Sequence, residues 1–380
     1  MHHSRFGTRT LTRLIAIVWA SGLLVASVSA QQPGLPTSLT HEAVVARIAD
    51  LRKITTPNGI EALEELEIDG TRQWISIRGR DRANPILLMI HGGPGSPTMP
   101  VSWAFQGPWE DYFTVVQWDQ RGVGKNALTA DHAALAPTLT VESSVADAEA
   151  VVAHLRRRLD QDRVVVMGYS WGSIVGSLLA QRRPEWLYAY VGVGQASYRG
   201  DDYLFTRLIE LATAARNQEA LAELRTMAPY PNGVPPVQSV VTSRKWARHF
   251  GGAWYGRTDF GPYSSAPDWA PEYSDAERAA MDRASGWATV TLLAEMFSQR
   301  LDTLPPFKVP VVVLMGRHDL HTPHQPAREM YDRLEAPRKR FITFELSAHV
   351  PMMEEPGRFL RALIDEVLPL TRTAAARSPR

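Results

Sequence analysis

The chain has 380 residues, 44% of them hydrophobic, and its 41 basic and 40 acidic residues give a formal net charge of +1. This length and composition can bury one large core together with an inserted subdomain. The balanced charge excludes the basic surface typical of nucleic-acid-binding proteins, so we expect no nucleic acid among the partners. The chain has no cysteine, which excludes disulfides and a lipidated cysteine.

Residues 1–30 have the pattern of a secretory signal peptide. Three arginines precede an apolar stretch at 14–28, and residues 28–30 are small, as at a cleavage site. Serines and a glycine interrupt the stretch, which is shorter than the roughly 20 residues that a membrane-spanning helix needs. We therefore predict an exported protein, periplasmic or secreted, with no membrane span after signal cleavage.

The pattern after the signal peptide predicts an α/β fold. Residues 31–57 contain a linker and an amphipathic helix. Strands are expected at 63–68 and 73–77, and Asp69-Gly70 between them signals a hairpin. From the apolar strand at 86–90 onward, strands alternate with helices, which is typical of a mostly parallel sheet.

Two turns follow the next strands. The strand at 86–90 ends in His91-Gly92-Gly93-Pro94-Gly95, whose glycines let the backbone approach a substrate oxygen closely. The strand at 115–118 ends in the turn 119–124, which contains a charged pair. We expect this second turn to buttress the site without taking a step in catalysis.

The apolar strand at 164–167 runs into Gly168-Tyr169-Ser170-Trp171-Gly172, and apolar residues then recur at helical spacing. The glycines permit a sharp turn from strand to helix, which lifts the Ser170 hydroxyl clear of the sheet edge. This arrangement predicts a nucleophile elbow. The alternative is a glycine-flanked serine in an ordinary strand-to-helix loop.

Residues 200–300 change to helical segments broken by prolines, with tryptophans scattered among them. This composition predicts a mainly helical cap. The aromatic residues there either line a substrate pocket or pack the cap on the core.

Two more strands supply an acid and a base. The strand at 311–315 ends at Asp319, and the strand at 341–346 is followed by His349. The order serine, acid, histidine suits acyl transfer, because an imidazole must take the proton of a serine hydroxyl and a carboxylate must orient the imidazole. The backbone N–H groups of Gly93 and Trp171 would hold the oxyanion.

Three histidines near the acid, His318, His321 and His324, could also indicate a metal site. They lie in one loop with no matching carboxylate and histidine spacing elsewhere, which favours a solvated loop. We expect no metal and no cofactor.

Four of these motifs together resemble the signature set of the proline iminopeptidase branch of the α/β-hydrolases. They are His91-Gly92-Gly93-Pro94-Gly95, Asp119-Gln120-Arg121-Gly122-Val123-Gly124, Gly168-Tyr169-Ser170-Trp171-Gly172 and Gly316-Arg317-His318-Asp319. The resemblance implies an α/β-hydrolase fold, with a mostly parallel sheet and an inserted mainly helical cap. It implies that Ser170 is the nucleophile, Asp319 the acid and His349 the base, in an aminopeptidase acting on N-terminal residues of peptides.

The cap departs from that family. Members that cleave N-terminal residues hold the substrate ammonium with cap acids, one of which follows a tryptophan pair. The corresponding stretch here begins at Trp246 and has Phe250 where the acid would fall. Glu295 is the nearest candidate for a second acid, and a surface position on an amphipathic helix is its alternative. Glu295, Trp246 and Phe250 are therefore the expected substrate-binding residues.

Three functions remain open, and all take a small-molecule or short-peptide substrate. The first is the aminopeptidase; the second is a carboxylesterase or lactonase with the same triad. The third is a non-catalytic binding module, which the intact Ser170, Asp319 and His349 argue against. The predicted organisation is a signal peptide at 1–30, a linker and helix at 31–57, the catalytic core at 58–199 and 301–369, the cap at 200–300 and a disordered tail at 370–380.

Overall fold

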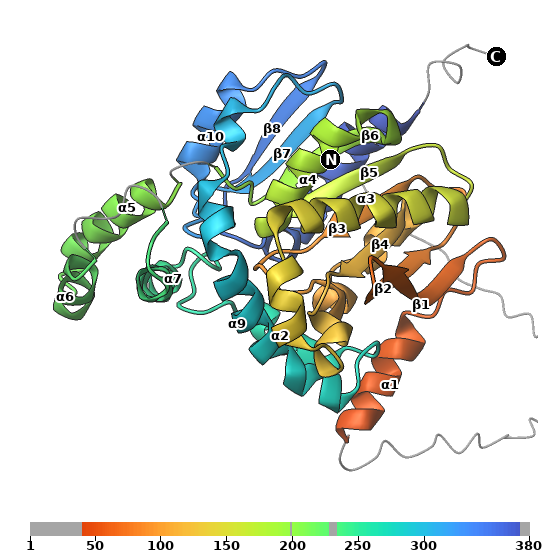
Figure 1. Cartoon of the computed structure of the whole chain (residues 1–380), viewed down its shortest axis with the longest axis horizontal. Helices are drawn as coiled ribbons and strands as arrows, with labels where there is room; N and C mark the ends of the chain where they lie inside the picture. Colours follow the sequence, from red (N-terminus) through yellow and green to blue (C-terminus); the bar gives the residue numbers. More distant parts are fainter. Residues whose placement is uncertain (1–39, 198–199, 228–233, 373–380) are drawn as a thin grey trace, which may run out of the picture. The chain divides into compact units, whose positions relative to one another are not determined.

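The structure is a computed structural model that describes residues 40–197, 200–227 and 234–372. The predicted signal peptide at 1–30 and most of the tail predicted from residue 370 lie outside these ranges. An eight-stranded sheet runs in the order β1-β2-β4-β3-β5-β6-β7-β8 (Figure 1). β1–β2 and β2–β4 pair antiparallel, and all other pairs are parallel. The strands are β1 (Ile60–Ile68), β2 (Thr71–Gly79), β3 (Ile86–Ile90), β4 (Thr114–Asp119), β5 (Val164–Tyr169), β6 (Leu187–Val193), β7 (Val311–Gly316) and β8 (Lys339–Phe344).

Helices lie on both faces of the sheet, which explains why every residue of β3, β4, β5 and β7 is buried. Leu88 of β3 faces one apolar cluster, formed with α3 and α4, and its neighbour Leu87 faces a second cluster, formed with α12. The α-helices of the described residues are α1 (His41–Leu51), α2 (His132–Leu135), α3 (Val141–Arg158), α4 (Trp171–Arg182), α5 (Gly200–Ala214), α6 (Gln218–Arg225), α7 (Val237–His249), α8 (Pro262–Ser265), α9 (Asp275–Ser298), α10 (His324–Arg333), α11 (Pro351–Glu354) and α12 (Pro356–Ala362).

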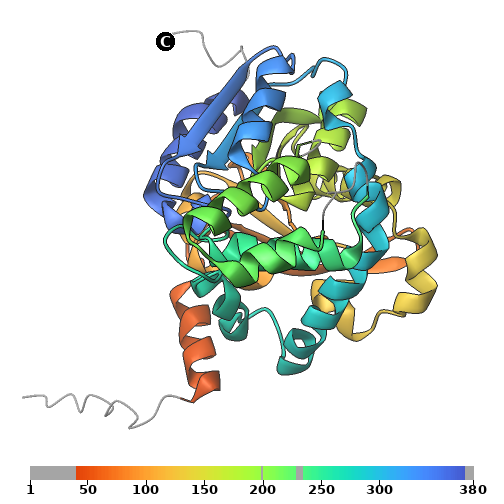
Figure 2. The ribbon, with the colours of Figure 1, turned by 90° about the vertical axis from the view of Figure 1, so that its left-hand side faces the viewer.

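Helices α5 to α9 form a cap that is inserted between β6 and β7. Figure 2 shows the green helices of this segment in front of the strands. An apolar cluster holds the first helices of the cap together: Leu208, Leu224 and Trp246 contribute from three successive helices, and Leu320 joins it from the loop after β7. The mostly parallel sheet with an inserted helical cap confirms the predicted fold class.

Two details differ from the sequence expectations. β6 is a buried parallel strand between β5 and β7 that the sequence analysis did not assign. The last strand ends at Phe344, and Leu346, which we expected inside it, is 62% exposed because the chain has already turned toward the loop of His349. No helix in the described part of the chain has both the length and the apolar character of a membrane span.

Candidate active site

Ser170 occupies a tight turn between β5 and α4. Its φ of +54° lies in the left-handed region, a conformation that costs a non-glycine residue about 1–3 kcal/mol. The start of α4 packs closely against the neighbouring strand β3. A Cβ added to Gly172 would lie 2.1 Å from the carbonyl oxygen of Ile90 on that strand. The close approach of strand and helix therefore maintains the turn that presents the serine, as predicted for an elbow.

The three predicted triad side chains meet at the carboxyl end of the sheet. His349 Nε2 lies 3.1 Å from Ser170 Oγ, and His349 Nδ1 lies 2.8 Å from Asp319 Oδ2. The carboxylate of Asp319 also accepts hydrogen bonds from the backbone N–H groups of His321 (2.7 Å) and Thr322 (2.9 Å). With its proton on Nδ1, the imidazole can accept the serine proton at Nε2 while the carboxylate steadies the resulting imidazolium.

The cap helps to hold the acid and base loops. The backbone N–H of Leu320, next to the acid, donates to the carbonyl of Gly252 (3.1 Å), and that of His349 donates to the carbonyl of Ala253 (3.2 Å). A Cβ added to Gly252 would lie 2.2 Å from the Cβ of Leu320, so this contact requires a glycine. The segment that follows α7 thus bridges the two loops, and no local sequence signal indicated it.

The glycine turn after β3 lies against the elbow. A Cβ on Gly92 would approach Ser170 Cβ to 3.0 Å, and Gly93 has a φ of +111° that favours glycine. Gly93 and Trp171 both line the cavity over Ser170. Their backbone N–H groups are therefore in the part of the molecule where an oxyanion would form.

Gln120 connects the two loops that carry these N–H groups. Its side-chain amide donates to the carbonyl of His91 (3.3 Å) and accepts from the indole N–H of Trp171 (3.2 Å). Burial lowers the pKa of His91 to about 4, so its ring is neutral. Nδ1 can then donate to the carbonyl of Gly92 (2.9 Å), while Nε2 accepts from the backbone N–H of Gln120 (3.3 Å).

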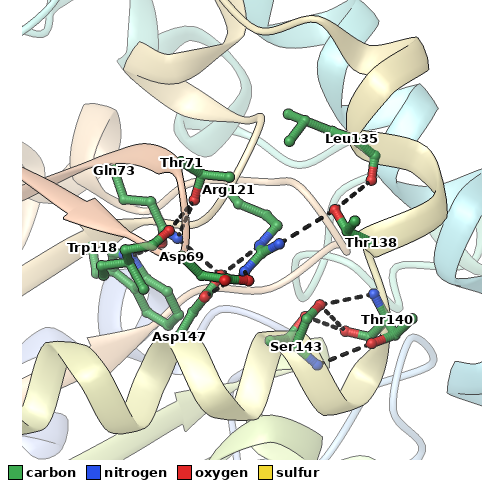
Figure 3. Close-up of polar contacts among 12 residues, drawn as sticks. Asp69, Thr71, Gln73, Trp118, Arg121, Leu135, Thr138, Thr140, Ser143 and Asp147 are labelled. Atoms are coloured by element: carbon green, nitrogen blue, oxygen red, sulfur yellow. Dashed lines mark hydrogen bonds and ion pairs between the residues drawn. The ribbon is translucent and has the colours of Figure 1, made fainter.

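The two charged residues of the 119–124 turn do not pair with each other. Arg121 donates to both oxygens of Asp147 on α3, at 2.7 and 2.6 Å, and Gln73 of β2 donates to the same carboxylate (Figure 3). Asp119 points instead toward the cap, where its Oδ2 accepts from the hydroxyl of Tyr273 and the backbone N–H of Lys125. The turn is thus tied to the core helix on one side and to the cap on the other.

A cavity of about 980 Å³ opens over Ser170 and His349, with walls from both the core loops and the cap. Arg244 and Arg248 of α7 line it, as do Asp282 of α9 and Asp202 of α5. The sequence analysis identified none of these charged residues.

The three expected substrate-binding residues lie away from this cavity. Trp246 is 2% exposed and donates its indole N–H to Glu223 within the cap cluster, against which Phe250 also packs. Glu295 accepts a hydrogen bond from the backbone N–H of Val141 (2.6 Å), at the start of α3. The reason is helical geometry: successive residues point about 100° apart, so Glu295 faces α3 while its neighbours Met296 and Phe297 line the cavity.

The three histidines around the acid face three different partners. His318 stacks on Tyr255, His321 stacks on His349, and His324 lies 2.9 Å from the hydroxyl of Thr343. Their rings therefore do not converge on a common point.

Comparisons with known proteins agree with this fold. A family model described as "Serine aminopeptidase, S33" matches residues 110–356. The probable aminopeptidase YbaC of Bacillus subtilis (strain 168) is 29% identical over 82% of this chain and 97% of its own length. The proline iminopeptidase of Lactobacillus delbrueckii subsp. bulgaricus is 25% identical over 73% of this chain and 88% of its own. The solved proline iminopeptidase of Mycobacterium smegmatis shares the fold, with a TM-score of 0.57, 20% identity and coverage of 81% of this chain and 98% of that one.

Proposed function

Since the chain belongs to the serine aminopeptidase S33 family of α/β-hydrolases and is a serine hydrolase, we propose that it is an exported aminopeptidase that removes N-terminal residues from short peptides. The observation that carries the proposal is the hydrogen-bonded series Ser170, His349 and Asp319, of which Ser170 and His349 line a large cavity. The signal-like pattern of residues 1–30 supports export.

In the proposed reaction, Ser170 Oγ attacks the carbonyl carbon of the N-terminal residue, and His349 Nε2 takes the hydroxyl proton. The backbone N–H groups of Gly93 and Trp171 stabilise the oxyanion, and Asp319 stabilises the imidazolium. His349 then gives its proton to the leaving amine as the C–N bond breaks, which leaves an acyl-Ser170 ester. Water, activated by His349, hydrolyses that ester and releases the free amino acid.

A free amine in the cavity needs an acidic partner, because a buried cation without one costs several kcal/mol. Asp282 is our candidate. It lines the cavity one helical turn before Ser285, whose hydroxyl lies 3.2 Å from that of Ser96 in the glycine turn after β3. Asp282 is therefore on the side of the cavity where the oxyanion would form, close to the N-terminal residue of a bound peptide.

Active-site labelling and a substrate panel test the proposal. A fluorophosphonate should label Ser170, and the wild-type protein should hydrolyse aminoacyl anilides. Ser170→Ala should lose at least about 10³-fold in kcat/KM, because the step that needs the nucleophile is lost. Ser264→Ala, which changes another serine of the cavity wall, is the matched control and should retain activity.

A label on any other serine, or full activity of Ser170→Ala, would contradict the mechanism. Hydrolysis of aryl esters without any cleavage of aminoacyl anilides would reject the aminopeptidase and leave the carboxylesterase or lactonase alternative.

A further inference from the structure

Two arginines of the cap face the cavity from one side of α7. Arg244 and Arg248 are four residues apart, and Val240, which also lines the cavity, lies four residues earlier. Residues at this spacing share one face of a helix. The opposite face carries Trp246, which is buried in the cap cluster. The register of α7 therefore turns two guanidinium groups toward the reaction site.

These arginines adjoin the catalytic loops. Arg244 donates to the carbonyl of Leu320 (3.4 Å), the residue between Asp319 and His321. The ring of His321 stacks on that of His349 with centroids 4.9 Å apart and planes 24° apart. Arg244 thus contacts the loop in which His321 stacks on the proposed general base, His349.

His321 has an unusual environment. It lines the cavity, yet its Nε2 is buried and has no hydrogen-bond partner among the described residues. Burial, together with electrostatic interactions with His349, Arg244 and Arg248, holds the pKa of His321 well below the usual range, so the ring is neutral. A buried polar nitrogen without a partner is destabilising, and a ligand that forms a hydrogen bond with it can recover that loss.

The charged residues that line the cavity lie on three cap helices. Asp282 is on α9, which contacts the glycine turn after β3; the two arginines are on α7, next to the loop after β7; and Asp202 is on α5, which packs against α7. Ser170 adjoins Gly92 of the glycine turn and lies 3.1 Å from His349 Nε2, and the ring of His349 stacks on that of His321 in the loop after β7. A substrate with a cation near the scissile bond would place that cation near Asp282. An anion farther along the substrate would lie near the two arginines.

We propose that Arg244, Arg248 and His321 form an anion subsite that binds a carboxylate of the substrate. The inference rests on the proposed function, which it narrows to substrates that carry a negative charge. Guanidinium groups bind carboxylates through charge-assisted hydrogen bonds, and the neutral imidazole can donate one further bond. The carboxylate can be the C-terminus of a dipeptide or tripeptide, or an acidic side chain of the residue that is removed.

Paired substrates test the subsite. A dipeptide with a free C-terminus is compared with its C-terminal amide, and a glutamyl anilide is compared with a glutaminyl anilide. The wild-type protein should favour the charged member of one pair by about 10- to 100-fold in kcat/KM, the range expected for hydrogen bonds to charged groups. The pair that shows the preference identifies the source of the carboxylate.

Substitution on α7 provides the specific control. Arg248→Gln should reduce the preference for the charged substrate about tenfold or more. Lys245→Gln removes a cation from the same helix, but Lys245 is bound to Glu223 outside the cavity, so the preference should stay. Equal treatment of both members of each pair by the wild-type protein, or equal effects of the two variants, would overturn the subsite.

A pair of ester substrates tests the anion subsite independently of the proposed aminopeptidase activity. An aryl hemisuccinate is compared with an aryl butanoate, which lacks the carboxylate. If no peptide or anilide is cleaved but the hemisuccinate is favoured and Arg248→Gln removes that preference, the aminopeptidase is rejected and the anion subsite is supported. If anilides are cleaved with no preference for any charged substrate, the aminopeptidase is supported and the subsite is rejected.

Discussion

Replacing Asp119 with asparagine should remove a pH dependence from the stability of this fold. Asp119 is fully buried at the end of β4, and its Oδ2 accepts from Tyr273 of the cap and from the backbone N–H of Lys125 (2.8 Å). Its Oδ1 is buried and has no hydrogen-bond partner in the described part of the chain. Burial raises the pKa of Asp119 to about 7; the bonds from Tyr273 and Lys125 and the charge of Lys125 oppose the rise, and Glu277 adds to it.

The direction in which stability changes with pH follows from the raised pKa of Asp119. The folded protein keeps a proton on Asp119 over a pH range in which the unfolded chain, with a pKa of 3.8, has released it. The stability contributed by this carboxyl is therefore fully present below pH 3.8 and is lost as the pH rises through about 7. The difference between the two pKa values corresponds to about 4 kcal/mol in total, of which about 3 kcal/mol falls between pH 5 and pH 8.

Urea titrations of the wild-type protein and Asp119→Asn at pH 5 and pH 8 measure the pH-dependent contribution of Asp119 to the free energy of unfolding. The free energy of unfolding of the wild type should fall by about 3 kcal/mol more than that of the variant between the two pH values. Asparagine keeps the shape and cannot ionise. Asp50→Asn, at an exposed position on α1, should behave as the wild type. The same pH dependence in wild type and Asp119→Asn would refute the reasoning.

Two further predictions concern buried or cavity-facing carboxylates. Asp282→Asn should lower kcat/KM for free aminoacyl anilides about tenfold relative to their N-acylated forms, because it removes the charge proposed to hold the ammonium. Asp275→Asn, on the same helix outside the cavity wall, should keep the wild-type ratio of the two kcat/KM values. Equal effects of both variants would reject Asp282 as the partner of the ammonium. Asp147→Ala should cost about 3–5 kcal/mol in urea unfolding at neutral pH, because it leaves the buried guanidinium of Arg121 with only its longer contacts to Asp69 and Thr138 and removes one acceptor of the Gln73 amide; a loss below about 1 kcal/mol would show that water replaces the carboxylate.

The sequence determined the elements whose conformation depends on neighbouring residues. Apolar runs predicted β3, β5 and β7, because strands buried on both faces need apolar side chains throughout. The glycines around Ser170 predicted its turn, since few other residues permit so close an approach of strand and helix. The positions of Asp319 and His349 after strands then predicted that the three side chains meet, because parallel strands bring their carboxyl ends to one edge.

Only the tertiary structure decided which side chains face the cavity. A helix with apolar and charged residues around much of its surface can be rotated in several ways, and packing against other elements selects one. On α9 that packing turns Glu295 to the start of α3, and on α7 it turns Trp246 into the cap and Arg248 to the cavity. The partner of Arg121 was equally undetermined, since Asp147 lies 26 residues away on a helix that only the folded sheet brings beside the turn. The set of side chains that lines the cavity thus depends on contacts between residues far apart in the chain, which local patterns do not encode.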